Sequence, residues 1–78
     1  MTRTEIIAEY NRIAAPMGDA AELSNGEWLA LRSEVAAKLI AFLSQFEAKR
    51  PLFFENPSFP HRSDSIGERI DWLRSRVA

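Results

Sequence analysis

The chain has 78 residues, of which 46% are hydrophobic and 27% charged, with a formal net charge of −1 and no cysteine. This length and composition indicate one folded domain, residues 1–78, and exclude a disordered chain. The lack of cysteine excludes disulfides and thiolate metal sites, and because a core of this size contributes only about 3–5 kcal/mol, self-association or a partner remains as a source of stability.

The sequence shows no sign of export or membrane insertion. Glu5 stands where the apolar core of a secretory signal would begin. The most apolar stretch, residues 35–46, is interrupted by Lys38, Ser44 and Gln45 and is too short to span a bilayer. We therefore expect a cytoplasmic protein that does not bind membranes.

The first predicted helix covers residues 3–15. Thr2 and Glu5 have the spacing of a capping box, in which each side chain satisfies the backbone N–H of the other residue. Apolar residues follow at helical spacing. Pro16 disfavours helix at the preceding residue and Gly18 completes the stop, so residues 19–23 are expected to be a short connector or one helical turn.

The second predicted helix is the longest and runs from a capping box at Ser24 and Glu27 to about Ala48, before Pro51. Its apolar side chains cover about half of its circumference, more than one neighbouring helix needs. The opposite side carries a row of alanines: Ala30, Ala37, Ala41 and Ala48. This row has two interpretations, plain helix propensity or close packing of another backbone.

Arg32 falls inside the apolar arc of this long helix. One interpretation places its aliphatic stem along Trp28 with the guanidinium reaching water. The other pairs the guanidinium with Glu9 or Asp19, or with a carboxylate of a partner.

Residues 49–62 form a proline- and phenylalanine-rich linker, with prolines at 51, 57 and 60 and the aromatic residues Phe53, Phe54 and Phe59. The prolines restrict the backbone without making it flexible. The phenylalanines fit either a linker folded over the end of the bundle or a docking segment, and we expect them to divide between the two roles.

The last predicted helix starts near Asp64 or Ser65, and Ser65 and Glu68 have the spacing of a third capping box. Asp71 and Arg74 are spaced to pair on its surface. Trp72 lies about 120° away from the apolar stripe, so it fits the rim of the core or an interface anchor. Residues 66–74 also resemble the opening helix of the lambda-repressor type of helix-turn-helix domain. This resemblance covers nine residues, and too few residues follow them to form a recognition helix. No function is therefore transferred from that family.

No pattern in the chain indicates catalysis, a metal site or a cofactor. The three glycines are isolated, which excludes the common phosphate-binding loops. His61 is the only imidazole and lies in the linker, where a solvated turn is its simplest role. Glu5 and Glu9 are one turn apart but are expected on a solvated helix face. We therefore expect no enzymatic activity and no small-molecule substrate.

The sequence as a whole predicts an all-α fold: a small three-helix bundle with a long central helix and the Pro/Phe-rich linker before the last helix. The favoured function is a non-enzymatic protein–protein interaction module (a small regulator, inhibitor or adaptor) that self-associates as a homodimer or binds another protein. The candidate interface consists of Ala30, Ala37, Ala41, Phe53, Phe54, Phe59 and Trp72. The alternative is a small nucleic-acid-binding regulator that uses Arg62, Arg69, Arg74 and Arg76, which the nearby acidic residues disfavour.

Overall fold

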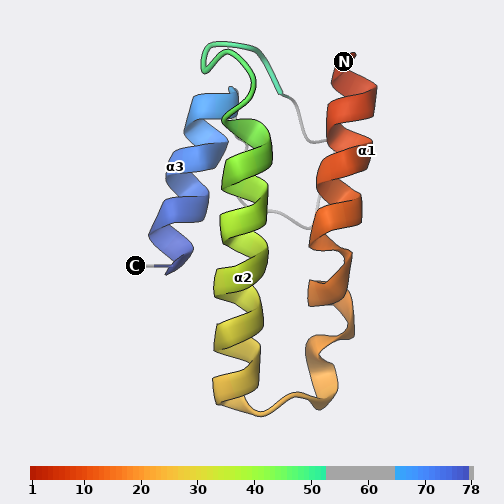
Figure 1. The fold of residues 1–78 in the computed structure, drawn as a ribbon, viewed down its shortest axis with the longest axis vertical. Coiled ribbons are helices and arrows are strands. Elements are labelled where there is room, and N and C mark those ends of the chain that lie inside the picture. Colours follow the sequence, from red (N-terminus) through yellow and green to blue (C-terminus); the bar gives the residue numbers. More distant parts are fainter. Residues whose placement is uncertain (53–64, 78) are drawn as a thin grey trace.

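Three α-helices and one 3₁₀-helix lie side by side in the computed structural model, which describes residues 1–52 and 65–77 except for the side chains of Asp19 and Ala20. The elements are α1 (Arg3–Ala14), η1 (Ala15–Glu22), α2 (Asn25–Leu43) and α3 (Ile66–Val77). The long α2 runs antiparallel to both α1 and α3 (Figure 1). The predicted all-α, three-helix arrangement with a long central helix is thus confirmed. No helix in the described part of the chain is long and apolar enough to cross a membrane.

Both capping boxes predicted for the first two helices are present. The Thr2 hydroxyl accepts from the Glu5 amide at 3.2 Å, and the Glu5 carboxylate accepts from the Thr2 amide at 2.9 Å. Ser24 and Glu27 make the same reciprocal pair, each at 3.3 Å. These bonds satisfy backbone donors that the first turn of a helix leaves without partners, and so they fix where each helix begins.

Replacing Ser24 with alanine is expected to lower the free energy of unfolding by about 0.5–2 kcal/mol, because the amide of Glu27 loses its acceptor. Ser33, exposed in the middle of the same helix, provides the control. Ser33→Ala should be neutral or slightly stabilising, since alanine is the better helix former. Urea denaturation of both variants measures the difference, and equal costs would contradict the capping role.

The long helix ends earlier than its sequence pattern predicts, at Leu43 rather than about Ala48. From there the chain continues in tight turns, and the Ser44 hydroxyl donates to the Ile40 carbonyl at 2.6 Å. These turns place the carbonyls of Ala48 and Arg50 beside the start of α3, where they accept from the amides of Gly67 and Ile66 at 2.9 and 3.0 Å. The bonds satisfy two amides in the first turn of α3, which have no partner within that helix.

Gly67 allows this close approach between α3 and the turn after α2. A Cβ at this position would lie 3.2 Å from the Ala48 carbonyl oxygen and 3.3 Å from its Cβ. The Ser65 hydroxyl accepts from the Glu68 amide at 3.2 Å, which confirms the predicted start of the last helix. Capping and packing together set the position of α3 against the end of α2.

The first helix ends at Ala14, one residue before the predicted end, and η1 follows it over Ala15–Glu22, where a short connector or one helical turn was expected. Pro16 has no amide hydrogen to continue the α-helical bonding, and the chain winds more tightly from Ala15 onward. As a result α1 and η1 together lie along the whole length of α2, whereas α3 lies beside only its C-terminal part (Figure 1). The N-terminal part of α2 therefore lacks α3 as a neighbour, unlike its C-terminal part.

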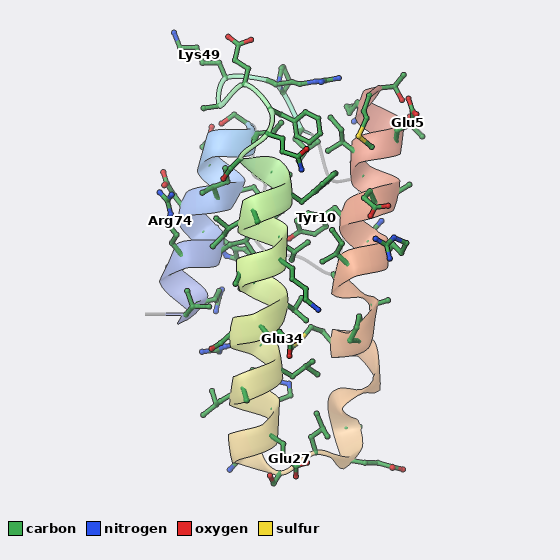
Figure 2. The ribbon with its side chains drawn as sticks, viewed as in Figure 1. Glu5, Tyr10, Glu27, Glu34, Lys49 and Arg74 are labelled. Atoms are coloured by element: carbon green, nitrogen blue, oxygen red, sulfur yellow. The ribbon has the colours of Figure 1, made fainter. Side chains whose placement is uncertain are left out.

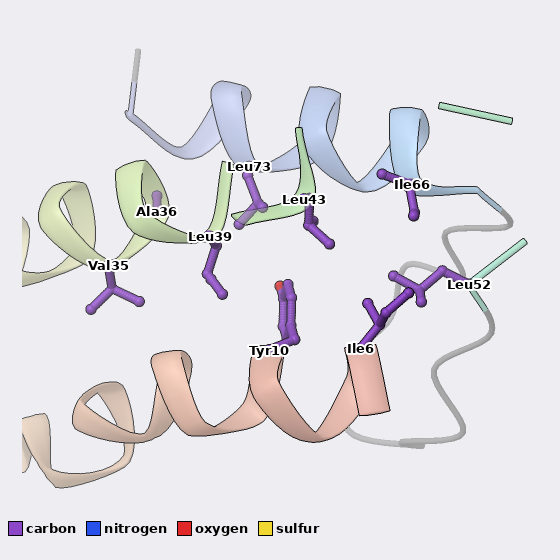
Figure 3. Packing of buried hydrophobic residues seen from close by; sticks show 9 residues of the cluster. All are labelled: Ile6, Tyr10, Val35, Ala36, Leu39, Leu43, Leu52, Ile66 and Leu73. Carbon is purple, nitrogen blue, oxygen red and sulfur yellow. The ribbon is translucent and has the colours of Figure 1, made fainter. Parts of the chain in front are cut away.

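The core lies where α1, α2 and α3 meet, and side chains from all three helices point toward one another there (Figure 3). Leu43 is fully buried at its centre. Arg69 of α3 is also buried, with 1% of its surface exposed. Among the described residues, the buried hydrophobic ones are Ile6, Tyr10, Val35, Ala36, Leu39, Leu43, Leu52, Ile66 and Leu73.

Candidate functional site

A groove of about 500 Å³ lies where α1 continues into η1, beside α2 and the C-terminal part of α3. It exists because α3 is too short to cover the N-terminal part of α2 (Figure 1). The groove is open to solvent rather than enclosed, and its surface is mostly apolar. Its lining residues are Tyr10, Ala14, Met17, Gly18, Trp28, Arg32, Val35, Ala36, Leu39, Trp72, Leu73 and Arg76.

Tyr10 lies at the inner end of this groove, at its junction with the core. Its side chain extends from α1 toward α2, whereas Glu5, Lys49 and Arg74 lie on the outside of the molecule (Figure 2). The phenol ring is buried, with 4% of the residue exposed. The inner end of the groove therefore continues directly into the core.

Two arginines of the groove each lie over the ring of a tryptophan. The Arg32 guanidinium carbon is 5.0 Å from the Trp28 ring centroid, and that of Arg76 is 4.7 Å from the Trp72 ring centroid. Such cation–π contacts leave the in-plane N–H groups of a guanidinium directed away from the ring. Two cationic donors thus line a mostly apolar surface.

The structure confirms the predicted contact between Arg32 and Trp28, but the Arg32 guanidinium is not fully in water. Its Nε atom is buried and has no hydrogen-bond acceptor among the described residues. The alternative pairing with Glu9 is wrong, because Glu9 bonds to Arg12. The other proposed partner, Asp19, has no described side chain. Arg32 therefore brings a buried donor that needs an acceptor to the groove.

Arg69 connects the groove to the core without lining the groove itself. Its guanidinium lies over the rings of Tyr10 and Trp72, at 5.8 and 4.7 Å from their centroids. Burial lowers the pKa of Arg69, and the Tyr10 phenol, as its hydrogen-bond partner, opposes that shift. Burial also raises the pKa of Tyr10, against the charge of Arg69. The buried Arg69 guanidinium thus packs against the ring of Trp72, which lines the groove.

The two carboxylates of the first helix are engaged in local bonds. Hydrogen bonds from Thr2 lower the pKa of Glu5, and Arg12 lowers the pKa of Glu9. A general acid at neutral pH would need a raised pKa instead.

On α3, the surface residues Asp71 and Arg74 form the ion pair that their spacing predicts. Arg74 Nη1 lies 3.8 Å from Asp71 Oδ1.

The structure separates the predicted interface residues into different places. Ala30, Ala37 and Ala41 are exposed on α2, about half a turn away from its core residues. Trp72 is partly buried and lines the groove, so it does not join the alanine row. Phe53, Phe54 and Phe59 lie outside the described residues, as do His61 and Arg62.

Several groove residues were not identified as site residues from the sequence. Met17 and Gly18 were taken only as the end of the first helix, and Arg76 only as a possible phosphate contact. The one available signal was Arg32, a charge within an apolar arc next to Trp28. The rest depends on where η1 and α3 end relative to α2, which local pattern does not determine.

Comparison with known proteins finds no relative: no protein-family model, no curated protein and no solved structure matches this chain.

Proposed function

We propose that this chain is a non-enzymatic protein-interaction module that receives an apolar segment of a partner protein in the groove. The observation that carries this proposal is the gathering of Tyr10, Trp28 and Trp72 around an open groove. Aromatic side chains dominate the binding energy of protein interfaces. Sites for small molecules usually enclose most of their ligand, whereas a groove that is open along one side suits a peptide segment whose other face stays in water.

Site-specific photo-cross-linking tests this proposal, with benzoylphenylalanine placed at Gly18 or at Gly26. Both glycines are exposed, and a Cβ at either position meets no atom within 4 Å, so both substitutions should fold. Gly18 lines the groove. Gly26 does not, because it precedes Trp28 by two residues and faces the opposite side of α2.

Irradiation in cells that naturally contain the protein should yield a discrete protein adduct from position 18 and not from position 26. Identical adducts from both positions, or none from position 18, would contradict binding in the groove. An adduct of twice the chain mass from position 18 alone would identify the bound segment as part of a second copy.

We also propose self-association through the outer face of α2, as a second interaction surface. There Leu29 leaves 49% of its surface exposed, beside the exposed alanine row Ala30, Ala37 and Ala41. Small side chains allow close approach of a second helix, and an exposed leucine adds apolar area.

Light scattering after size exclusion, at tens of micromolar protein, is expected to give about twice the chain mass. Ala37→Glu should return the protein to a monomer without unfolding it, because its charge would be desolvated only in the dimer. Ala8→Glu makes the same change at an exposed alanine of α1, away from the alanine row, and should leave the mass unchanged. A wild-type protein that remains monomeric on concentration would rule out this second surface.

The nucleic-acid alternative receives little support from the positions of its arginines. Arg69 is buried and therefore not available to phosphate. Arg74 is paired with Asp71, so Arg76 is the one exposed arginine without an acidic neighbour that remains among the described members of this set. A surface for duplex binding would need several unpaired cations on one face.

A further inference from the structure

The groove carries positive charge, which limits the kinds of partner segment that can bind in it. Its described lining side chains include two arginines and no carboxylate. One arginine comes from α2 and the other from α3, so two of the elements that border the groove each contribute a positive charge. A bound segment that were only apolar would cover these charges and remove them from water at a cost.

The geometry of the two arginines points to a carboxylate as the group that meets them. Each guanidinium lies over a tryptophan ring, so that its N–H groups point in its own plane and away from the ring. Carboxylates accept two parallel bonds from a guanidinium, and these charge-assisted bonds are the strong ones.

We propose that the groove selects an acidic amphipathic helix of a partner protein, with its apolar residues against the groove tryptophans and an Asp or Glu bonded to Arg32 or Arg76. This inference rests on the proposed function, because it names the chemistry of the partner at the same groove. A helix presents apolar side chains three and four residues apart with an acidic residue beside them, which matches an apolar groove bordered by cations.

A displayed library of short peptides tests the acidic preference, with apolar residues fixed at helical spacing and the remaining positions random. Peptides selected on the full chain should be enriched in Asp and Glu next to the apolar residues. In one selected peptide, changing that Glu to Gln should weaken binding about tenfold or more, measured by fluorescence anisotropy. The difference should shrink as salt is added, because ions screen a partly exposed charge pair.

Variants of the protein connect this preference to the groove. Arg76 is exposed, so Arg76→Gln should fold and reduce the discrimination between the Glu and Gln peptides. Arg32→Gln should do the same, and Arg32→Lys should restore only part of it because lysine lacks the planar fork. Arg74→Gln makes the same change of charge outside the groove lining and should retain the full discrimination. Circular dichroism melting establishes that each variant is folded.

The possible outcomes separate this inference from the function on which it rests. If position 18 cross-links a partner but Glu and Gln peptides bind equally, the groove is an interaction site without acidic preference, and the inference is wrong. Equal loss of discrimination in Arg74→Gln would also overturn it. Decanoate is the probe for a free amphiphile. If decanoate binds at micromolar concentration in an Arg32-dependent way and no library peptide binds, the ligand is a small molecule and both proposals fail.

Discussion

Replacing Leu43 with alanine is expected to lower the free energy of unfolding by about 2–5 kcal/mol. Leu43 is fully buried at the end of α2, where the side chains of α1 and α3 converge on it (Figure 3). Removing its side chain loses both the transfer energy and the packing around the cavity left behind. Because a domain of this size has about 3–5 kcal/mol from its core, the substitution should remove most of that stability and leave a measurable unfolded fraction at 25 °C.

Leu29 offers a matched control in the same helix, since Leu29→Ala makes the same chemical change at a side chain that is 49% exposed. It should cost well under 1 kcal/mol in the monomer, because surface substitutions usually change stability by about 0.5 kcal/mol or less. Circular dichroism melts of both variants at low micromolar concentration make the comparison. Similar melting temperatures for the two variants would contradict the assignment of the core.

The beginnings of the helices could be predicted from the sequence because they depend on local bonds. Thr2, Ser24 and Ser65 each accept from the amide three residues later, as their capping patterns predict. Such bonds involve residues that are neighbours in the chain. The sequence pattern therefore contains nearly all of the information that determines them.

The ends of the helices, and with them the groove, could not be predicted in the same way. The sequence after Leu43 favours helix to about Ala48, but the chain turns there, and its Ala48 and Arg50 carbonyls accept from the first amides of α3. These bonds join residues that are distant in the chain, which a helical period does not show. Because the groove depends on where α3 and η1 lie along α2, its residues Met17 and Arg76 could not be recognised as a set.

Arg69 is the clearest case in which local pattern was misleading. Within α3 it was grouped with Arg74 and Arg76 as a candidate phosphate contact, yet it is buried between Tyr10 and Trp72. In residues 66–77 alone, nothing distinguishes it from the other arginines. The aromatic ring that receives it belongs to α1, more than fifty residues earlier in the chain.

Changing Tyr10 to phenylalanine is expected to cost about 1–3 kcal/mol, because the buried guanidinium of Arg69 then loses the phenol as its hydrogen-bond partner. In an Arg69→Met background the same change should cost much less, since no buried charge remains to be satisfied. Arg69→Met itself should change the free energy of unfolding little, because methionine retains most of the side-chain volume and removes the cost of burying a charge. Arg69→Ala should lower it by about 2–5 kcal/mol, because the smaller side chain leaves a cavity. Urea denaturation of the four proteins in this cycle gives the coupling energy, and strictly additive costs would exclude the pairing.

The same pair predicts how stability changes at alkaline pH. Burial raises the pKa of Tyr10 in the folded protein above its ordinary value of about 10. As pH rises through that value, the phenol ionises in the unfolded chain while the folded protein keeps its proton, so the free energy of unfolding must fall. Below about pH 9 the phenol is protonated in both states and contributes no pH dependence.

Tyr10 is the only tyrosine, so the ultraviolet absorbance of phenolate follows its ionisation directly. The folded protein should titrate at higher pH than the protein in urea, and Tyr10→Phe should lose less stability than wild type between about pH 8 and pH 10.5. A phenol that titrates at the same pH in both states would show that burial does not outweigh the charge of Arg69 at Tyr10.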